Sequence, residues 1–423
     1  MHVLYLNPNG LLGGAEVALL DVLAGIREAE PGWHLHLIVS AEGPLAARAR
    51  ALGVGITVLP FPRSLARIGD ASAGGPAGRQ IGRLRLLSRL LFAGPGVANY
   101  LVRLRKLIRR LHPDVIHTNG FKMHIVGALA KPASVPLIWH IHDYVNSRPF
   151  MGRLIRRLQK RCSLVLANSN SVKSDIENVL FRGARNPPTA PGESARVLTI
   201  YNGVDTSVFS PDGPCLDLDE LSGLPHPEES PEHPIVRVGM LATFARWKGH
   251  EVFLRALALT PTDIPWRGYV IGGAQYQTDG SQFSIVELKS LARRLAVSDR
   301  VGFTGFVDHP AAAMRSLDIV VHASTEPEPF GLVIVEGMAC GRAVIVSEAG
   351  GAAELFESGV TALGHMPGDA AQLAERITQL AADPDLRTRL GRAGRATVEQ
   401  RFNRARLAQE LVPIYRRVAA AAN

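Results

Sequence analysis

Short apolar runs alternate with longer segments of helical character along the first half of the chain. The runs of strand length are Val3–Leu6, His34–Val39, Ile56–Leu59, Val115–His117, Leu137–Ile141, Leu164–Ala167 and Val197–Ile200. An alternation of strands and helices is typical of a parallel, doubly wound sheet. We therefore predict an α/β domain in residues 1–210.

A second series of apolar runs follows a break in the pattern. Residues 211–234 mix prolines, acidic residues and turns without a clear apolar period, which predicts a linker. The second series comprises Ile235–Val238, Gly268–Ile271, Val301–Thr304, Ile319–His322 and Ala343–Val346. Because 423 residues are too many for one ordinary core, we predict a second α/β domain in residues 235–400.

Composition narrows the class of protein. Hydrophobic residues make up 46% of the chain and charged residues 20%, which is typical of a globular protein with a large core. The three cysteines lie far apart and show no Cys-x-x-Cys spacing, so we predict neither a disulfide framework nor a zinc site. The N-terminus reads as a strand and lacks the regions of a signal peptide, and no apolar run reaches the length of a membrane span. We expect a cytoplasmic protein.

The net charge of +9 is unevenly distributed. No acidic residue lies between Asp70 and Asp114, whereas basic residues there alternate with leucines: Arg79, Arg83, Arg85, Arg89, Arg103, Arg105, Lys106, Arg109 and Arg110. A second basic stretch covers residues 148–161. Such helices either dock peripherally on an anionic membrane at its inner face or form a solvated surface. Nucleic acid is disfavoured, because no aromatic residues or recognised binding motif accompany the charge.

The most informative stretch is residues 325–341, which lies between two apolar runs and fits a strand, loop and helix. Ligands of parallel sheets collect at the carboxyl ends of the strands. The loop amides of Phe330, Gly331 and Leu332 would open a helix and face an anion such as a phosphate. Glu336 lies among apolar residues, so it cannot stay ionised there without hydrogen-bond donors, which a sugar diol would supply.

Two further segments end strands of the first domain. Gly13 and Gly14 follow the first strand and open a helix, but their spacing is not that of a dinucleotide fingerprint. His140 and His142 point to the same side of their strand. Two histidines at this spacing more often comprise one core and one site residue than a metal site, and we predict no metal.

Three segments of the second domain stand out at the ends of predicted strands. Lys248 lies beside a glycine at the end of a strand, where its compact charge could stabilise a diphosphate leaving group. The other two segments are glycine-rich or aromatic strand ends: Gly272-Gly273 and Phe306-Val307. An exposed surface lysine is the alternative interpretation of Lys248.

Taken together, these motifs resemble family 4 of the retaining glycosyltransferases. Two glutamates separated by seven residues, Glu328 and Glu336, with Pro-Phe-Gly-Leu after the first, are similar to that family's nucleotide-sugar signature. The resemblance implies a GT-B fold of two Rossmann-like domains facing a cleft, with a last helix, residues 401–423, that crosses back to the first domain. It also implies that Glu328 contacts donor sugar hydroxyls, that Glu336 contacts the ribose, and that His142 lies near the donor sugar. The segments Gly272-Gly273 and Phe306-Val307 resemble the family's loops on the pyrophosphate and base sides of the donor.

The function implied is transfer of a hexose-type sugar from a nucleotide diphosphate sugar to an acceptor, lipid-linked or polysaccharide, without a further cofactor. A nucleotide-sugar epimerase and a catalytically silent sugar-binding protein remain as alternatives. The chain departs from the family at Thr243, where an arginine five residues before the lysine is usual. Arg246 is the nearest replacement, because an arginine fork binds phosphate in a bidentate manner.

Overall fold

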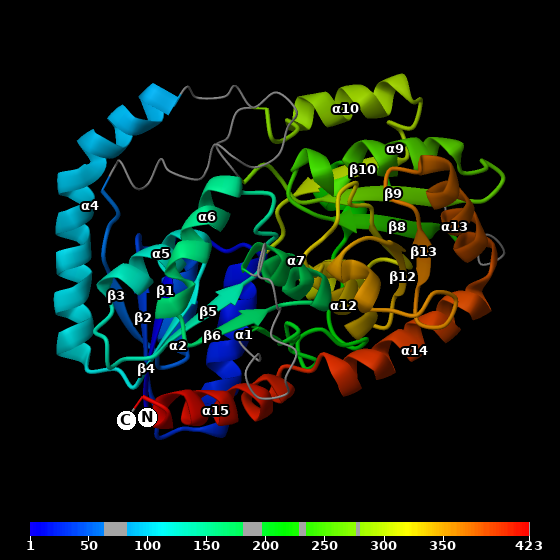
Figure 1. Cartoon of the computed structure of the whole chain (residues 1–423). Coiled ribbons are helices and arrows are strands. Elements are labelled where there is room, and N and C mark those ends of the chain that lie inside the picture. The colour runs from blue at the N-terminus through cyan, green and yellow to red at the C-terminus, as the bar shows by residue number, and fades with distance from the viewer. Residues whose placement is uncertain (63–82, 181–196, 228–233, 276–279, 423) are drawn as a thin grey trace. The chain divides into compact units, whose positions relative to one another are not determined.

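The computed structural model describes residues 1–62, 83–180, 197–227, 234–275 and 280–422, and the side chains of residues 83–94 are not among those described. The chain divides into two compact units (Figure 1). The first unit contains Met1–Gly203 together with Arg404–Asn423, and the second contains Val204–Asn403. Each unit is built on its own parallel sheet.

The sheet of the first unit has seven strands in the order β3-β2-β1-β4-β5-β6-β7, and every pairing is parallel. The strands are β1 (His2–Asn7), β2 (His34–Val39), β3 (Gly55–Val58), β4 (Val115–Asn119), β5 (Leu137–Ile141), β6 (Leu164–Ala167) and β7 (Val197–Thr199). Residues of β4 and β5 are buried throughout. Strands buried in this way need helices on both faces of the sheet.

Two hydrophobic cores cover the two faces of this sheet. One core is formed with α1 (Gly14–Ala29), α2 (Pro44–Ala51) and the last helix, α15 (Ala405–Ala420). The other is formed with α4 (Arg83–Leu111), α5 (Phe121–Ala130), α6 (Pro149–Leu158) and α7 (Asn170–Leu180), and the 3-10 turn η2 (Gln159–Arg161) follows α6. Helix α15 packs along α1 (Figure 1), and its Tyr415 is fully buried.

The sheet of the second unit has six parallel strands in the order β10-β9-β8-β11-β12-β13. They are β8 (Val236–Leu241), β9 (Trp266–Ile271), β10 (Val301–Gly305), β11 (Ile319–His322), β12 (Ala343–Ser347) and β13 (Leu363–His365). The helices are α8 (Leu218–Ser222), α9 (His250–Leu259), α10 (Ile285–Arg294), α11 (Pro310–Arg315), α12 (Leu332–Ala339), α13 (Ala370–Ala382) and α14 (Pro384–Arg401). Two 3-10 turns, η3 (Arg246–Lys248) and η4 (Gly351–Glu354), complete it.

The prediction of two doubly wound α/β domains is confirmed. Strand β13 was not predicted, because its three residues are too few to show a pattern. Residues 211–234 were predicted to form a linker. In the structure, the described residues of this segment belong to the second unit and contain α8. There the buried carboxylate of Asp219 accepts hydrogen bonds from Arg267 and Tyr269. Residues 228–233 of the segment lie outside the described residues.

Candidate functional site

The carboxyl ends of the strands in the second unit bring Lys248 and Glu328 together. Lys248 ends η3, after β8, and Glu328 lies between β11 and α12. The Lys248 Nζ lies 2.9 Å from Oε1 and 2.8 Å from Oε2 of Glu328. It also lies 4.1 Å from the centre of the Trp247 ring. The two side chains are 21% and 9% exposed, so water screens this ion pair weakly.

Two further groups bind the Glu328 carboxylate. Ser324 Oγ donates to Oε2 over 2.8 Å, and His322 Nε2 lies 3.3 Å from the same oxygen. Burial raises the pKa of the Glu328 carboxyl, but the charge of Lys248 and the hydrogen bond from His322 outweigh it, and the pKa falls well below its usual range. Glu328 is therefore ionised at neutral pH.

Glu336 lies on α12 and has a contrasting environment. Helix α12 begins after Gly331, whose φ of 97° is a left-handed conformation that glycine adopts without strain. Phe330, just before it, is buried, whereas Leu332 is half-buried. No hydrogen-bond partner for the Glu336 carboxyl lies among the residues that the structure describes, and burial raises its pKa to about 7. Half of the Glu336 carboxyls therefore carry a proton near neutral pH.

The glycine-rich strand ends lie side by side. The Gly272 N–H donates to the Gly305 carbonyl over 2.8 Å, which joins the ends of β9 and β10. A Cβ atom on Gly272 would lie 2.1 Å from the Ala242 carbonyl oxygen, and one on Gly273 would lie 2.7 Å from the Phe306 ring. Gly272, whose φ is 134° and whose neighbour is backbone, therefore requires glycine, whereas a side chain at position 273 would require the Phe306 ring to move. Phe306 is 63% exposed although it is large and apolar, whereas Val307 is half-buried.

Arg246 points to α10 in this structure. Its guanidinium donates to Glu287 over 2.8 Å and to the Gly280 carbonyl over 3.0 Å, and it lies 4.3 Å from the centre of the Phe283 ring. Arg246 and Glu287 are both about half exposed, so the pair contributes little to stability. A role of Arg246 on a diphosphate requires this ion pair to open.

In the first unit, the glycine pair lies at the start of α1. Gly13 is the N-cap residue, and its N–H donates to the carboxylate of Glu16 over 3.1 Å. The same carboxylate accepts a hydrogen bond from Asn7 at the end of β1. Glu16 is buried, and burial raises the pKa of its carboxyl. Glu16 therefore fixes the loop that carries Gly13 and Gly14.

His142 follows β5, is half-buried, and lies in a row with the buried His117 and His140. The centres of the His140 and His142 rings are 4.0 Å apart, and those of His117 and His140 are 5.2 Å apart. His142 Nε2 lies 3.2 Å from Asn119 Oδ1. Burial lowers the pKa of His142 to about 4, so its ring is neutral at pH 7.

Sequence reasoning did not single out His117, which bonds to Tyr415. The two residues are 298 positions apart, and nothing in the local pattern relates them.

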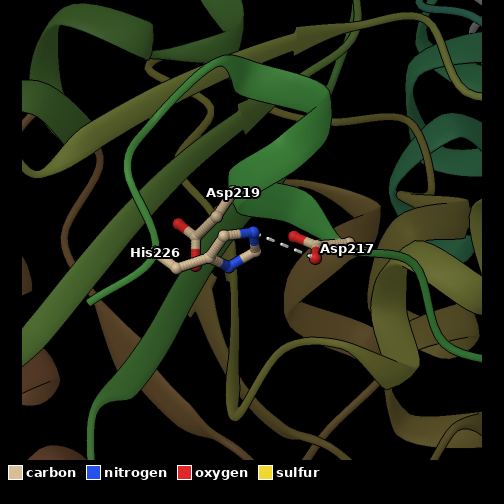
Figure 2. Close-up of side chains that lie close together, drawn as sticks. All are labelled: Asp217, Asp219 and His226. Atoms are coloured by element: carbon tan, nitrogen blue, oxygen red, sulfur yellow. Dashed lines mark ion pairs between the residues drawn. The ribbon is translucent and has the colours of Figure 1, made fainter. Parts of the chain in front are cut away.

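One group of side chains could hold a metal ion in the described part of the chain: Asp217, Asp219 and His226 (Figure 2). Each has an alternative structural role. Asp217 caps α8 by accepting from the Glu220 N–H, and Asp219 accepts from Arg267 and Tyr269. His226 is exposed and lies 3.6 Å from Asp217. These partners account for both carboxylates, so the arrangement is explained by attachment of α8 to the sheet.

Comparison with known proteins relates both units to glycosyltransferases. Residues 228–397 match the family model described as "Glycosyl transferases group 1", and residues 12–208 match "Glycosyltransferase Family 4". N-acetyl-alpha-D-glucosaminyl L-malate synthase of Bacillus anthracis is 24% identical over 74% of this chain and 77% of its own length. D-inositol 3-phosphate glycosyltransferase 2 of Catenulispora acidiphila is 32% identical over 72% of this chain and 70% of its own length.

Solved structures show the same fold. Anabaena Alr3699/HepE, crystallised with UDP and glucose, has a TM-score of 0.75 and 26% identity, with 98% of this chain and 99% of that chain covered. Sucrose-phosphate synthase from Thermosynechococcus elongatus has a TM-score of 0.73 at 22% identity, with both chains fully covered. The predicted GT-B fold is thereby confirmed, and the comparisons give no support to an epimerase or a silent sugar-binding protein. The sequence matches across both units show that the chain belongs to family 4 of the glycosyltransferases, in group 1.

Proposed function

We propose that this glycosyltransferase uses a nucleotide diphosphate sugar as donor and retains the configuration at the anomeric carbon. The observation that carries the proposal is the buried Lys248–Glu328 pair at the carboxyl ends of β8 and β11. It places a cation for phosphate and a carboxylate for sugar hydroxyls next to each other. The relative Alr3699/HepE was crystallised with UDP-glucose, which supports a donor of this class.

In the proposed arrangement, Lys248 neutralises the diphosphate and Glu328 accepts hydrogen bonds from the donor sugar. The amides of Phe330, Gly331 and Leu332 bind phosphate oxygens. Glu336 binds the ribose diol, because two hydroxyl donors would stabilise its ionised form. The exposed ring of Phe306, together with Gly272, Gly273 and Val307, forms the side that binds the nucleotide.

The proposed transfer needs no resident metal or other cofactor. The bond between the anomeric carbon and the diphosphate oxygen breaks, and the acceptor oxygen bonds to the same face of that carbon. The acceptor proton passes to the leaving diphosphate oxygen. Charge develops on the diphosphate as this bond breaks, and a preorganised cation such as Lys248 stabilises that charge. A neutral His142 can accept a hydrogen bond from the sugar without adding repulsive charge.

The experiment that tests this function is transfer from a panel of nucleotide diphosphate sugars, with the product anomer identified by proton NMR. A donor that binds should first raise the thermal stability of the protein by mass action. Product of the same anomeric configuration as the donor is expected. An inverted product would overturn retention, and conversion of the donor without an acceptor would favour an epimerase.

We further propose that the first unit docks on an anionic membrane surface in the cytoplasm. Its α4 and α6 carry exposed basic side chains, with the exposed apolar residues Val102 and Phe150 among them. The described basic residues are Arg103, Arg105, Lys106, Arg109, Arg110, Arg153, Arg156 and Arg157. None of the helices in the described residues is long and apolar enough to cross a membrane. Basic helices with apolar partners bind the surface instead.

Vesicle sedimentation tests the docking. Binding to anionic vesicles should fall steeply with added salt, since salt screens exposed charge. Replacement of Arg103, Arg105, Arg109 and Arg110 by glutamine should weaken binding, whereas the same change at four exposed arginines of the second unit should not: Arg293, Arg294, Arg389 and Arg392. Equal binding to neutral and anionic vesicles, or none to either, would make these helices an ordinary solvated surface.

A further inference from the structure

Three donors converge on one oxygen of Glu328. The distances to Oε2 are 2.8 Å from Lys248 Nζ, 2.8 Å from Ser324 Oγ and 3.3 Å from His322 Nε2. Ser324 is 1% exposed and His322 is 3% exposed. Water therefore cannot replace either hydrogen bond if the protein donor is removed.

Ser324 and His322 are themselves held by neighbouring strands. Ser347, at the end of β12, donates from Oγ to the Ser324 carbonyl over 2.6 Å. His365, at the end of β13, has its Nε2 3.2 Å from the His322 carbonyl. His322 Nε2 also lies 3.0 Å from Ser324 Oγ. Because a carboxylate only accepts hydrogen bonds, Nε2 is the nitrogen of His322 that carries the proton.

Two anions require the positive charge of the Lys248 ammonium. In the structure it neutralises the buried Glu328 carboxylate. In the proposed reaction it must also neutralise the donor diphosphate. Withdrawal of one partner from a buried ion pair leaves an uncompensated charge, which is strongly unfavourable. Lys248 and His322 are charged or titratable groups that face Glu328, and His365 lies behind His322.

We propose that Ser324 and His322 are positioning residues, which hold the Glu328 carboxylate in place and ionised when Lys248 turns toward the donor diphosphate. The inference rests on the proposed function, because that function is what draws Lys248 away. Neither residue needs to touch the donor. Their hydrogen bonds to Oε2 come from buried side chains at strand ends, so they can remain on the carboxylate when Lys248 turns to the phosphate.

Steady-state kinetics over a range of pH tests this proposal. Ser324→Ala should lower kcat about tenfold, as expected for loss of a buried hydrogen bond to a charged group. The acid limb of the kcat profile should also move to higher pH, because Glu328 then takes up a proton more readily. Ser324→Thr retains the hydroxyl and should stay close to wild type. Equal losses in the two variants, or an acid limb that does not move, would overturn the proposal.

His322 gives an independent pair of variants. His322→Gln places an amide N–H close to the position of Nε2, whereas His322→Phe keeps the ring shape without a donor. We expect the phenylalanine variant to have a lower kcat and an acid limb at higher pH. The glutamine variant should be close to wild type in both kcat and the position of the acid limb. Identical behaviour of the two would show that His322 acts only by filling space.

A measurement without donor separates this inference from the proposed function. Lys248→Met removes the ammonium permanently, so that the contribution of Ser324 and His322 to the Glu328 carboxylate can be measured without it. The carbon-13 signal of the Glu328 carboxyl, assigned by its loss in Glu328→Gln, gives the pKa directly. Addition of Ser324→Ala to Lys248→Met should raise this pKa by about one unit. An unchanged pKa of Glu328 would overturn the positioning role. A raised pKa in a protein that transfers no sugar would reject only the proposed function.

Discussion

The carboxyl ends of the two sheets bury titratable groups in opposite ways. In the first unit, the buried His117 and His140 and the half-buried His142 lie beside one another, and desolvation lowers all three pKa values. In the second unit, Glu328 is equally buried but has Lys248 within 2.8 Å. Burial without an opposite charge removes charge, and burial with one preserves it. The first sheet therefore presents neutral groups and the second an ion pair.

We expect the largest effect on this contrast when Lys248, the cation of the ion pair in the second unit, is removed. Lys248→Ala should lower kcat on the order of a hundredfold or more, as for loss of one preorganised stabilising group. It should also lower the free energy of unfolding by about 3–5 kcal/mol, because the buried Glu328 carboxylate loses the opposite charge of Lys248. The double variant Lys248→Met, Glu328→Gln should recover stability without activity. Kinetics and denaturant unfolding measure both, with the exposed Lys289→Ala as control. Wild-type turnover in Lys248→Ala would remove Lys248 from the site.

Glu336 lies between the two cases, since the residue is half-buried and desolvation of its carboxyl raises the pKa to about 7. Glu336→Ala should reduce kcat/KM for the donor on the order of a hundredfold, because the ribose loses its acceptor. Donor affinity of the wild type should rise as pH increases through about 7, since the ionised carboxylate accepts two hydrogen bonds. The exposed Glu375→Ala on α13 is the matched control. Unaltered donor kinetics would show that Glu336 belongs only to the core.

The neutral histidines predict a loss of stability in acid. The pKa of His117 is lowered to about 3, below the ordinary value of 6.5, so the unfolded chain binds more protons between these values. Its contribution is complete above pH 6.5 and falls as the pH decreases toward 3. When the pH falls from 7 to 4.5, the free energy of unfolding of His117→Phe should therefore decrease by about 1–3 kcal/mol less than that of the wild type. Urea unfolding at both pH values measures this, with the exposed His34→Phe as control. Equal decreases in wild type and His117→Phe would show that groups other than His117 cause the loss of stability in acid.

The smallest effect concerns Arg246. If this residue opens its ion pair with Glu287 to bind the diphosphate, Arg246→Ala should lower kcat/KM for the donor about tenfold. Glu287→Gln should not lower it, because that change weakens only the competing pair. Measurement of kcat/KM for the donor in the two variants tests whether Arg246 binds the diphosphate. If Arg246→Ala behaves as wild type, Lys248 acts alone or with another cation.

The sequence predicts those parts of the molecule in which neighbours in the chain are also neighbours in space. The strand series and the family motifs carry such local signals, and the two α/β domains follow from them. The pairing of Lys248 with Glu328 spans 80 positions, and that of Arg267 with Asp219 spans 48. No periodicity encodes such pairs. Ser324 was likewise missed, because a serine at a strand end is also typical of an ordinary turn.

The return of α15 to the first unit has a consequence for how the protein is made. Residues 204–403 are continuous in the chain and contain all the strands of their sheet. The core around Leu23, by contrast, includes Leu411 and Tyr415, which are translated after the whole second unit. On the ribosome, the second unit can thus fold before the first is complete. The first unit must wait with an open apolar face until α15 emerges, and deletion of α15 would impair the unit whose synthesis began first.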